Sequence, residues 1–218
     1  MGSLFAKPEL NEFQKEKILH EFYVFYDLNH DARLTWEDFV ATREKTRKIN
    51  CWEQGSEKDR LCEELFKSLW QSLQALADKD SDNRITPSEW IKMWNDIYRK
   101  IADDKRKDIS DVDKLPFWLH RYLLYRFQLY DRTADGIIDQ DEFEYVLSHF
   151  DISPVDARKA WTLMSQDGGR KLDFEYFCSL AFEYYFSTDS ASLGNFLTGK
   201  LSFPSATVGS TKAKSYKT

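Results

Sequence analysis

The chain has 218 residues, which is enough for one or two domains with a substantial core. It carries 37 acidic and 31 basic side chains, and this net charge of −6 argues against a general nucleic-acid binder, which needs a basic face. Three scattered cysteines do not indicate a disulfide framework, and no apolar run is long enough for a membrane span. We therefore expect a cytoplasmic protein without a transmembrane segment.

The first predicted helix begins after Asn11, which forms a capping box with Gln14 three residues later. Apolar residues then recur at three- and four-residue steps, as on one face of an α-helix: Ile18, Phe22, Phe25 and Tyr26. The same period appears later in Trp90, Trp94, Ile97 and Ile101. Each of these predicted helices lies beside an acidic segment.

These acidic segments belong to a twelve-residue pattern that occurs four times. The copies are DLNHDARLTWED (27–38), DKDSDNRITPSE (78–89), DRTADGIIDQDE (131–142) and SQDGGRKLDFEY (165–176). Position 8 is always aliphatic, and an aromatic residue follows position 12: Leu34 and Phe39, Ile85 and Trp90, Ile138 and Phe143, Leu172 and Phe177. Helix, twelve-residue loop, helix is the EF-hand. The predicted fold class is all-α, with two pairs of EF-hands in a compact globule and short two-stranded links between paired loops.

The second and third loops have the oxygen ligands of a calcium site. Calcium takes side-chain oxygens from positions 1, 3 and 5, a backbone carbonyl from position 7 and a bidentate acid from position 12. In the second loop these are Asp78, Asp80, Asp82, the Arg84 carbonyl and Glu89. In the third loop they are Asp131, Thr133, Asp135, the Ile137 carbonyl and Glu142. Thr133 brings no charge, which predicts a weaker site than the second.

The first loop departs from this pattern at two positions. Its predicted ligands are Asp27, Asn29, Asp31, the Arg33 carbonyl and Asp38. Ala32 stands at position 6, where glycine turns without strain, and costs about 1 kcal/mol at positive φ. Asp38 is one methylene shorter than Glu and is expected to reach an ion with one oxygen, which favours six-fold coordination. We expect calcium here too, with magnesium as a competitor.

The fourth loop has lost its ligands and is predicted to bind no ion. Ser165 replaces the first acid, Gly169 the third ligand and Tyr176 the closing acid. Too few oxygens remain to offset the dehydration of a divalent ion. Its predicted role is structural, with Leu172 pairing with Ile138 across the two loops.

The predicted organisation has five parts: an N-terminal EF-hand pair (1–102), a charged linker (103–114), a C-terminal pair (115–190), a packing segment (191–203) and a flexible tail (204–218). Pro116 and Pro154 are predicted in the first turns of helices, the latter after a Ser153 cap. Ser210, Thr211, Ser215 and Tyr216 precede lysines in the tail, so a basic-directed kinase is an alternative to a plain solvated tail.

The segments LNEFQKEKIL, EWIKMW, SQDGGRKL and EYYFS resemble the calexcitin and sarcoplasmic calcium-binding protein family. The resemblance covers residues 10 to about 203. It implies a compact cytosolic monomer, not an enzyme, with three working sites and a silent fourth. It also implies neuronal calcium signalling, with a membrane channel or another signalling protein as partner when calcium is bound, or calcium buffering. Asp38 agrees with the family's first loop, whereas Ala32 departs from its glycine. Only three methionines are present, which disfavours a Met-rich sensor groove.

Two other functions match part of the sequence. Calcium-triggered photoproteins share the four-hand plan, but none of the four histidines (His20, His30, His120, His149) lies in the last predicted helix, and photoproteins usually keep the fourth loop. A nucleotide-binding regulator would use GNFLTGKLS (194–202), which nearly matches a phosphate loop. Leu201 stands where that motif has its metal-binding hydroxyl, and no strand is predicted before Gly194, so a packed terminal segment is favoured.

Overall fold

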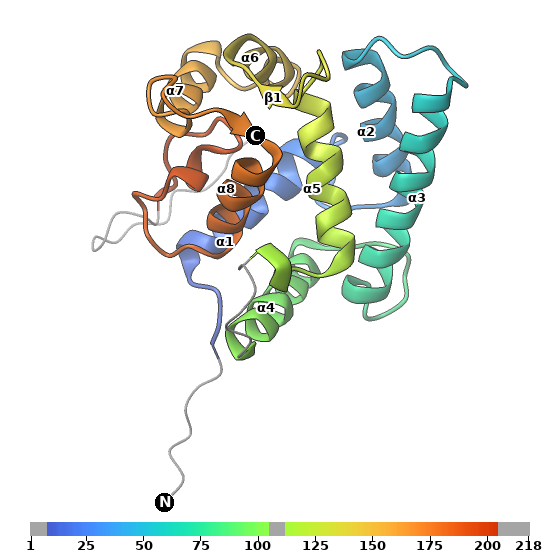
Figure 1. Ribbon diagram of the computed structural model, residues 1–218. Helices are drawn as coiled ribbons and strands as arrows, with labels where there is room; N and C mark the ends of the chain where they lie inside the picture. Colours follow the sequence, from blue (N-terminus) through green and yellow to red (C-terminus); the bar gives the residue numbers. More distant parts are fainter. Residues whose placement is uncertain (1–7, 105–111, 205–218) are drawn as a thin grey trace, which may run out of the picture.

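The computed structural model describes residues 8–104 and 112–204, and helices form most of it (Figure 1). The α-helices are α1 (Glu12–Glu21), α2 (Trp36–Ile49), α3 (Glu57–Ala77), α4 (Pro87–Asp103), α5 (Phe117–Tyr130), α6 (Gln140–Ser148), α7 (Pro154–Met164) and α8 (Phe174–Phe186). Shorter elements are a π-helix, η1 (Phe22–Tyr26), two 3₁₀ turns, η2 (Val112–Lys114) and η3 (Leu193–Phe196), and the strands β1 (Ile137–Ile138) and β2 (Leu172–Asp173). The predicted all-α class is confirmed.

Helix α1 starts as predicted but does not continue unchanged to the first loop. The Asn11 side chain accepts from the Gln14 N–H, and the Gln14 side chain accepts from the Asn11 N–H, both at 2.9 Å. At Phe22 the helix widens into η1, which ends where the Asp27 N–H donates to the Phe22 carbonyl at 2.9 Å. The apolar spacing predicted a helix here but gave no sign of the wider turn, which is uncommon and often found at functional sites.

The helices that leave the first three loops begin in a common way. Capping boxes join position 9 to position 12 of the loop in the pairs Thr35–Asp38, Thr86–Glu89 and Asp139–Glu142.

Pro154 occupies the first turn of α7 as predicted, and Ser153 is the N-cap residue, although its side chain makes no capping hydrogen bond. The prediction for Pro116 was wrong: this residue is itself the N-cap of α5, which begins at Phe117. Pro116 has extended backbone, ψ 147°, so it precedes the first helical turn.

The loops pair through the aliphatic residues at position 8. Leu34 and Ile85 exchange two backbone hydrogen bonds of 2.9 Å, forming a single antiparallel bridge. β1 and β2 are antiparallel, with Ile138 opposite Leu172 as predicted. The side chains of all four residues are buried. The expected two-stranded link is therefore present between the third and fourth loops, whereas a single bridge takes its place between the first and second loops.

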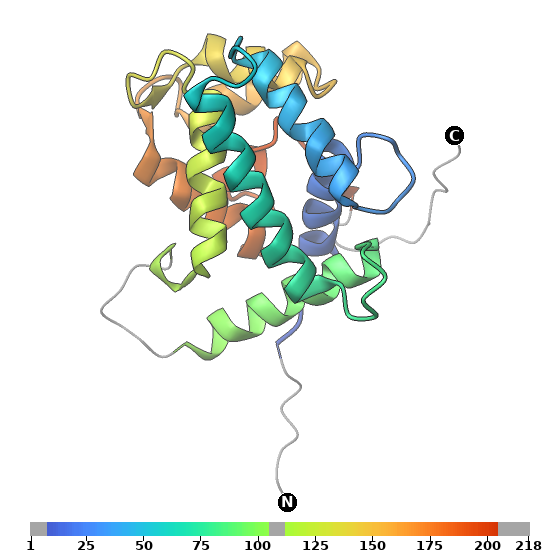
Figure 2. The same cartoon turned by 90° about the vertical axis from the view of Figure 1, so that its right-hand side faces the viewer.

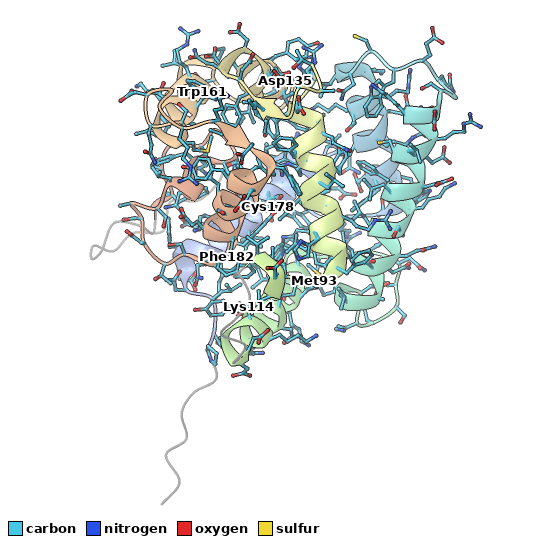
Figure 3. All side chains as sticks on the ribbon, viewed as in Figure 1. Met93, Lys114, Asp135, Trp161, Cys178 and Phe182 are labelled. Carbon is cyan, nitrogen blue, oxygen red and sulfur yellow. The ribbon has the colours of Figure 1, made fainter. Side chains whose placement is uncertain are left out.

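Aromatic side chains fill the interior between the helices. The largest buried ones include Trp90, Trp94 and Tyr185, and the rings of Trp94 and Tyr185 stack with centroids 4.3 Å apart. Figure 1 shows α5 in the middle, between α8 and the antiparallel pair α2 and α3. The turned view in Figure 2 shows α4 running across one end of the molecule. In Figure 3, Cys178 lies on α8, where it is buried, and Asp135 lies on the outer loop before β1.

Helix α1 packs into the C-terminal part of the chain as well as against α4. The Gln14 side chain donates to the Phe186 carbonyl at 2.8 Å, and the Tyr184 hydroxyl donates to the Lys17 carbonyl at 2.6 Å. The two predicted halves are thus in intimate contact, while the boundary at 102 stays a prediction. The middle of the linker, 105–111, and the tail hydroxyls, within 205–218, lie outside the described residues.

No helix within the described ranges combines the length and the apolar character that crossing a bilayer requires.

Candidate metal sites

The first three loops share one internal hydrogen-bond pattern. In the second loop the two Asp78 carboxylate oxygens accept from the N–H groups of Asp82 at 3.1 Å and Asn83 at 3.0 Å. The Asp82 carboxylate then accepts from the Arg84 N–H at 2.8 Å. The corresponding three bonds occur in the first and third loops at 2.9 to 3.1 Å. Three loops with different sequences therefore hold the acids of positions 1 and 5 in the same way.

The same loops also share two residues with left-handed backbone. Positions 4 and 6 have positive φ in each: His30 at 60° and Ala32 at 59°, Ser81 at 60° and Asn83 at 63°, Ala134 at 58° and Gly136 at 85°. Ala32 thus adopts the strained conformation that its place in the pattern predicted, and Asn83 adopts it with less strain. The turn at position 6 is a property of the loop, whichever residue occupies it.

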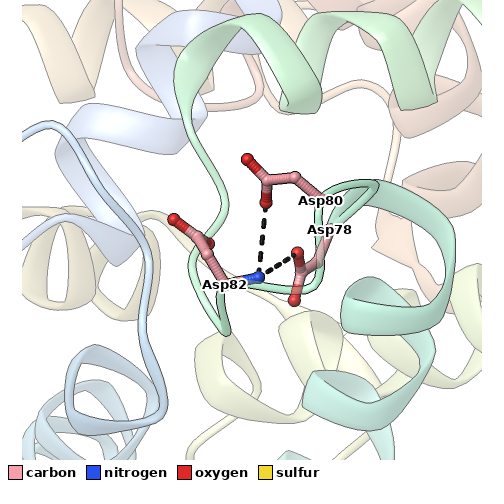
Figure 4. A group of neighbouring side chains, drawn as sticks. All are labelled: Asp78, Asp80 and Asp82. Atoms are coloured by element: carbon pink, nitrogen blue, oxygen red, sulfur yellow. Dashed lines mark hydrogen bonds between the residues drawn. The ribbon is translucent and has the colours of Figure 1, made fainter.

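The second loop brings three carboxylates together. One oxygen from each of Asp78, Asp80 and Asp82 lies within 4.8 Å of the others (Figure 4). The Asp82 N–H lies between two of them, donating to Asp78 at 3.1 Å and Asp80 at 3.3 Å. Like charges this close repel one another, so a divalent cation bound among them would remove an unfavourable interaction.

The closing acid at position 12 differs between the loops. One carboxylate oxygen of Glu89 accepts from Thr86, and the other reaches the Lys79 N–H across the loop at 3.3 Å. Glu142 likewise binds the Thr133 N–H across its loop at 2.8 Å. Asp38 binds Thr35 alone among the described residues, with one oxygen accepting from both its N–H at 3.0 Å and its hydroxyl at 2.8 Å. The shorter side chain therefore stays on its own side of the loop.

Burial separates the first loop from the second. Asp27 is fully buried, and burial raises the pKa of its carboxyl although backbone N–H groups oppose the shift. In the second loop, burial is outweighed by hydrogen bonds from Thr86 and Lys79, which lower the pKa of Glu89. Asp78, at position 1 of the second loop, is half-buried, so an ion at the first loop would compensate a more deeply buried first ligand.

The fourth loop has another conformation. Its positive φ angles fall at Gln166, Asp167 and Gly168, which are positions 2, 3 and 4. The Tyr176 hydroxyl donates to the Met164 carbonyl at 2.9 Å, and the Arg170 guanidinium lies 3.6 Å from the Tyr176 ring centroid. A cation–π pair thus occupies the place of the closing acid.

The glycines of GNFLTGKLS make packing contacts. A Cβ on Gly194 would lie 2.2 Å from the Leu180 carbonyl oxygen, and one on Gly199 would lie 2.6 Å from Leu147 Cδ1. The Lys200 ammonium lies 4.7 Å from the Phe203 ring centroid. Close approach to α8 and α6 therefore explains both glycines without a phosphate.

The comparisons with known proteins agree with this geometry. A family model described as "EF hand" matches residues 75–94 and 124–147. The sarcoplasmic calcium-binding proteins I, III and IV of Branchiostoma lanceolatum are 28% identical over 194 residues, covering 88% of this chain and 98% of theirs. The solved structure of a sarcoplasmic calcium-binding protein from amphioxus matches with a TM-score of 0.72 at 26% identity, covering 88% of this chain and 98% of that one. The chain is built from EF-hands and is similar along most of its length to sarcoplasmic calcium-binding proteins.

Calexcitin-1 of Caenorhabditis elegans is 25% identical to this EF-hand protein over 199 residues, covering 89% of this chain and 90% of the relative. Calcium-loaded apo-aequorin from Aequorea victoria also matches, with a TM-score of 0.59 at 14% identity, over 82% of this chain and 93% of that one. At that identity the likeness to a photoprotein shows a common fold alone. The amphioxus relatives are named for calcium binding.

Proposed function

We propose that this EF-hand protein binds calcium at three loops, 27–38, 78–89 and 131–142, while loop 165–176 serves as a structural partner. The observation that carries the proposal is the hydrogen-bond pattern shared by the three loops and absent from the fourth. It holds the acids of positions 1 and 5 in the same arrangement in each loop, and these are two of the oxygen ligands that a hard cation requires. The name of the sarcoplasmic calcium-binding relatives supports calcium as the ion.

Magnesium competes at the first loop in this proposal. One Asp38 oxygen is held by Thr35, as one Glu89 oxygen is held by Thr86, but among the described residues the other Asp38 oxygen makes no bond across its loop. Glu89 and Glu142 each extend an oxygen across their loops and are long enough to bind calcium with both. A loop that supplies one fewer oxygen suits the octahedral shell of magnesium better than the larger shell of calcium.

We propose cytoplasmic calcium buffering as the main role, with signalling to a protein partner such as a membrane channel as an additional role. Met93 and Met164, the two methionines that the structure describes, are both buried. The aromatic residues are largely engaged in packing among α1, α4, α5 and α8, so the described surface offers no Met-rich groove of the kind that broad-range sensors use.

Calcium calorimetry with and without 1 mM magnesium tests this function. We expect three ions per chain, with magnesium weakening the binding of one of them. Glu89→Gln and Glu142→Gln are each expected to remove one ion, whereas Tyr176→Phe, the matched change in the fourth loop, leaves the stoichiometry at three. Four ions, or a loss on Tyr176→Phe, would contradict the assignment of the silent loop.

A further inference from the structure

A buried ion pair joins the helix that leads into the first loop to the helix that leads into the third. Glu21 at the end of α1 and Arg126 on α5 are 1% and 5% exposed. Arg126 Nη1 donates to Glu21 Oε1 at 2.9 Å. The hydroxyls of Tyr122 on α5 and Tyr185 on α8 donate to the same oxygen at 2.7 and 3.0 Å. Three helices therefore meet at a single carboxylate oxygen.

The pair lies close to the first ligand of each loop. Only the π-helix η1 separates Glu21 from Asp27, and the Arg126 guanidinium lies 4.7 Å from the ring centroid of Phe25 within it. On the other side, Arg126 Nη2 donates to the Tyr130 hydroxyl at 3.4 Å, and Tyr130 immediately precedes Asp131. Contacts through Arg126, together with short stretches of the chain, thus connect position 1 of the first loop with position 1 of the third.

Stability alone is a poor reason to bury such a pair. The cost of removing two charges from water is often as large as their attraction, so apolar residues of similar size would stabilise the core equally well. A buried pair is sensitive to distance, however, because charges interact strongly where little water screens them. Its geometry therefore restrains the position of α1 relative to α5 more tightly than apolar packing would.

We propose that Glu21 and Arg126 are positioning residues that couple ion binding at loop 27–38 to ion binding at loop 131–142. An ion in one loop fixes the end of its leading helix, and the pair passes that restraint to the other helix. The second ion then binds to a loop that has less freedom to lose, so its affinity is higher. This inference rests on the proposed function, because it requires both loops to bind calcium.

Calorimetry in a two-loop background measures the coupling directly. In Glu89→Gln only the first and third loops bind, and adding Asp27→Asn or Asp131→Asn leaves one loop whose separate affinity can be measured. The coupling factor is the overall constant for two ions divided by the product of the two single-loop constants. We expect a factor of at least about five with the pair intact, and below about two when Glu21→Gln is added to all three proteins.

Two further variants distinguish a loss of coupling from a general loss of structure. Glu21→Met with Arg126→Met removes both charges together and leaves no unpaired ion, and it too is expected to lower the factor below about two. Thr46→Val is the matched control. It removes a different buried bond to α5, the 2.6 Å contact of Thr46 Oγ1 on α2 with the Tyr125 hydroxyl, and is expected to keep the coupling.

The outcomes separate the two proposals. Single-loop proteins that bind calcium with a coupling factor of one in the intact-pair background would overturn the coupling and leave the proposed function standing. A factor unchanged by the loss of Glu21, or lowered equally by Thr46→Val, would overturn the assignment to this pair. Single-loop proteins that bind no calcium would overturn the proposed function and the coupling together.

Discussion

At the scale of single residues, the side chain at position 12 sets the reach of each loop. Glu89 bonds both to its own helix start and across its loop, whereas Asp38 bonds, within the described part of the chain, to Thr35 alone. We predict that Asp38→Glu raises calcium affinity at the first loop about tenfold, or ~1.4 kcal/mol, because it adds one coordinating oxygen. Calcium titrations with and without magnesium measure the change in preference.

The opposite substitution can be made at position 12 of the third loop. Glu142→Asp withdraws the oxygen that reaches the Thr133 N–H and is expected to shift that loop toward magnesium. An unchanged calcium-to-magnesium preference in Asp38→Glu would rule out the length of this side chain as the cause.

Backbone strain at position 6 gives a second reciprocal pair. Gly136 has φ 85° and a Cβ placed on it meets nothing within 4 Å, so Gly136→Ala adds strain without a clash. We predict that it lowers the free energy of unfolding of the calcium-saturated protein by about 1 kcal/mol. Ala32→Gly relieves strain at φ 59° but frees the unfolded chain, so a gain below about 1 kcal/mol is expected. Urea unfolding measures both, and a loss in Ala32→Gly would contradict the strain argument.

At the scale of elements, a buried lysine holds the end of α8. Lys17 is fully buried on α1, and its ammonium donates to the Ser187 carbonyl at 3.0 Å and to Asn195 Oδ1 at 2.8 Å. Burial lowers the pKa of Lys17 from 10.5 to about 7, although Glu183 opposes the shift. Between these two values the unfolded chain keeps a proton that the folded protein has released, so stability rises with pH in this window.

We predict that this rise depends on Lys17. Relative to Lys17→Met, the wild-type free energy of unfolding should increase by about 1 kcal/mol from pH 7.5 to 8.5. Urea unfolding of the calcium-saturated proteins measures it. The buried thiols of Cys62 and Cys178, whose pKa values burial raises to about 12 and 11, contribute equally in both proteins and cancel in this comparison. Lys15→Met, which loses a surface bond to Glu12, should show no such difference. Parallel pH profiles for wild type and Lys17→Met would refute the argument.

Local patterns were sufficient to predict most elements and the loop register. The capping box at Asn11, the pairing of Leu172 with Ile138 and the turn at Ala32 all follow from residues near one another in sequence. On the buried face of α1, the sequence predicted the apolar residues but not the polar ones. Gln14, Lys17 and Glu21 lie at helical spacing beside Ile18 and Phe22, but polar residues at such positions usually face solvent. Their partners come from α5, α8 and η3, so local sequence could not reveal their burial.

At the scale of the whole molecule, the same contacts explain why the predicted division into two EF-hand pairs describes only part of the architecture. Helix α1 belongs to the first hand by sequence, yet it bonds to α5 through Glu21 and to α8 through Gln14 and Lys17. A description by consecutive pairs misses these bonds because they join residues more than 100 positions apart. We therefore expect the chain to unfold as one cooperative unit when calcium is bound.

The net charge gives a prediction for the whole molecule. Three divalent ions carry +6, which would bring the chain from −6 to zero. We predict that the calcium-free protein moves toward the anode at pH 7 and that saturating calcium brings its electrophoretic mobility close to zero. In Glu89→Gln with Glu142→Gln, the charge begins at −4 and one ion leaves −2, so the calcium-dependent change should fall to about a third. Magnesium alone should give a similar third in the wild type, because it is expected at the first loop only. Electrophoretic mobility that does not respond to calcium would contradict the three-site proposal. A full response to magnesium would show that the second and third loops do not discriminate between the two ions.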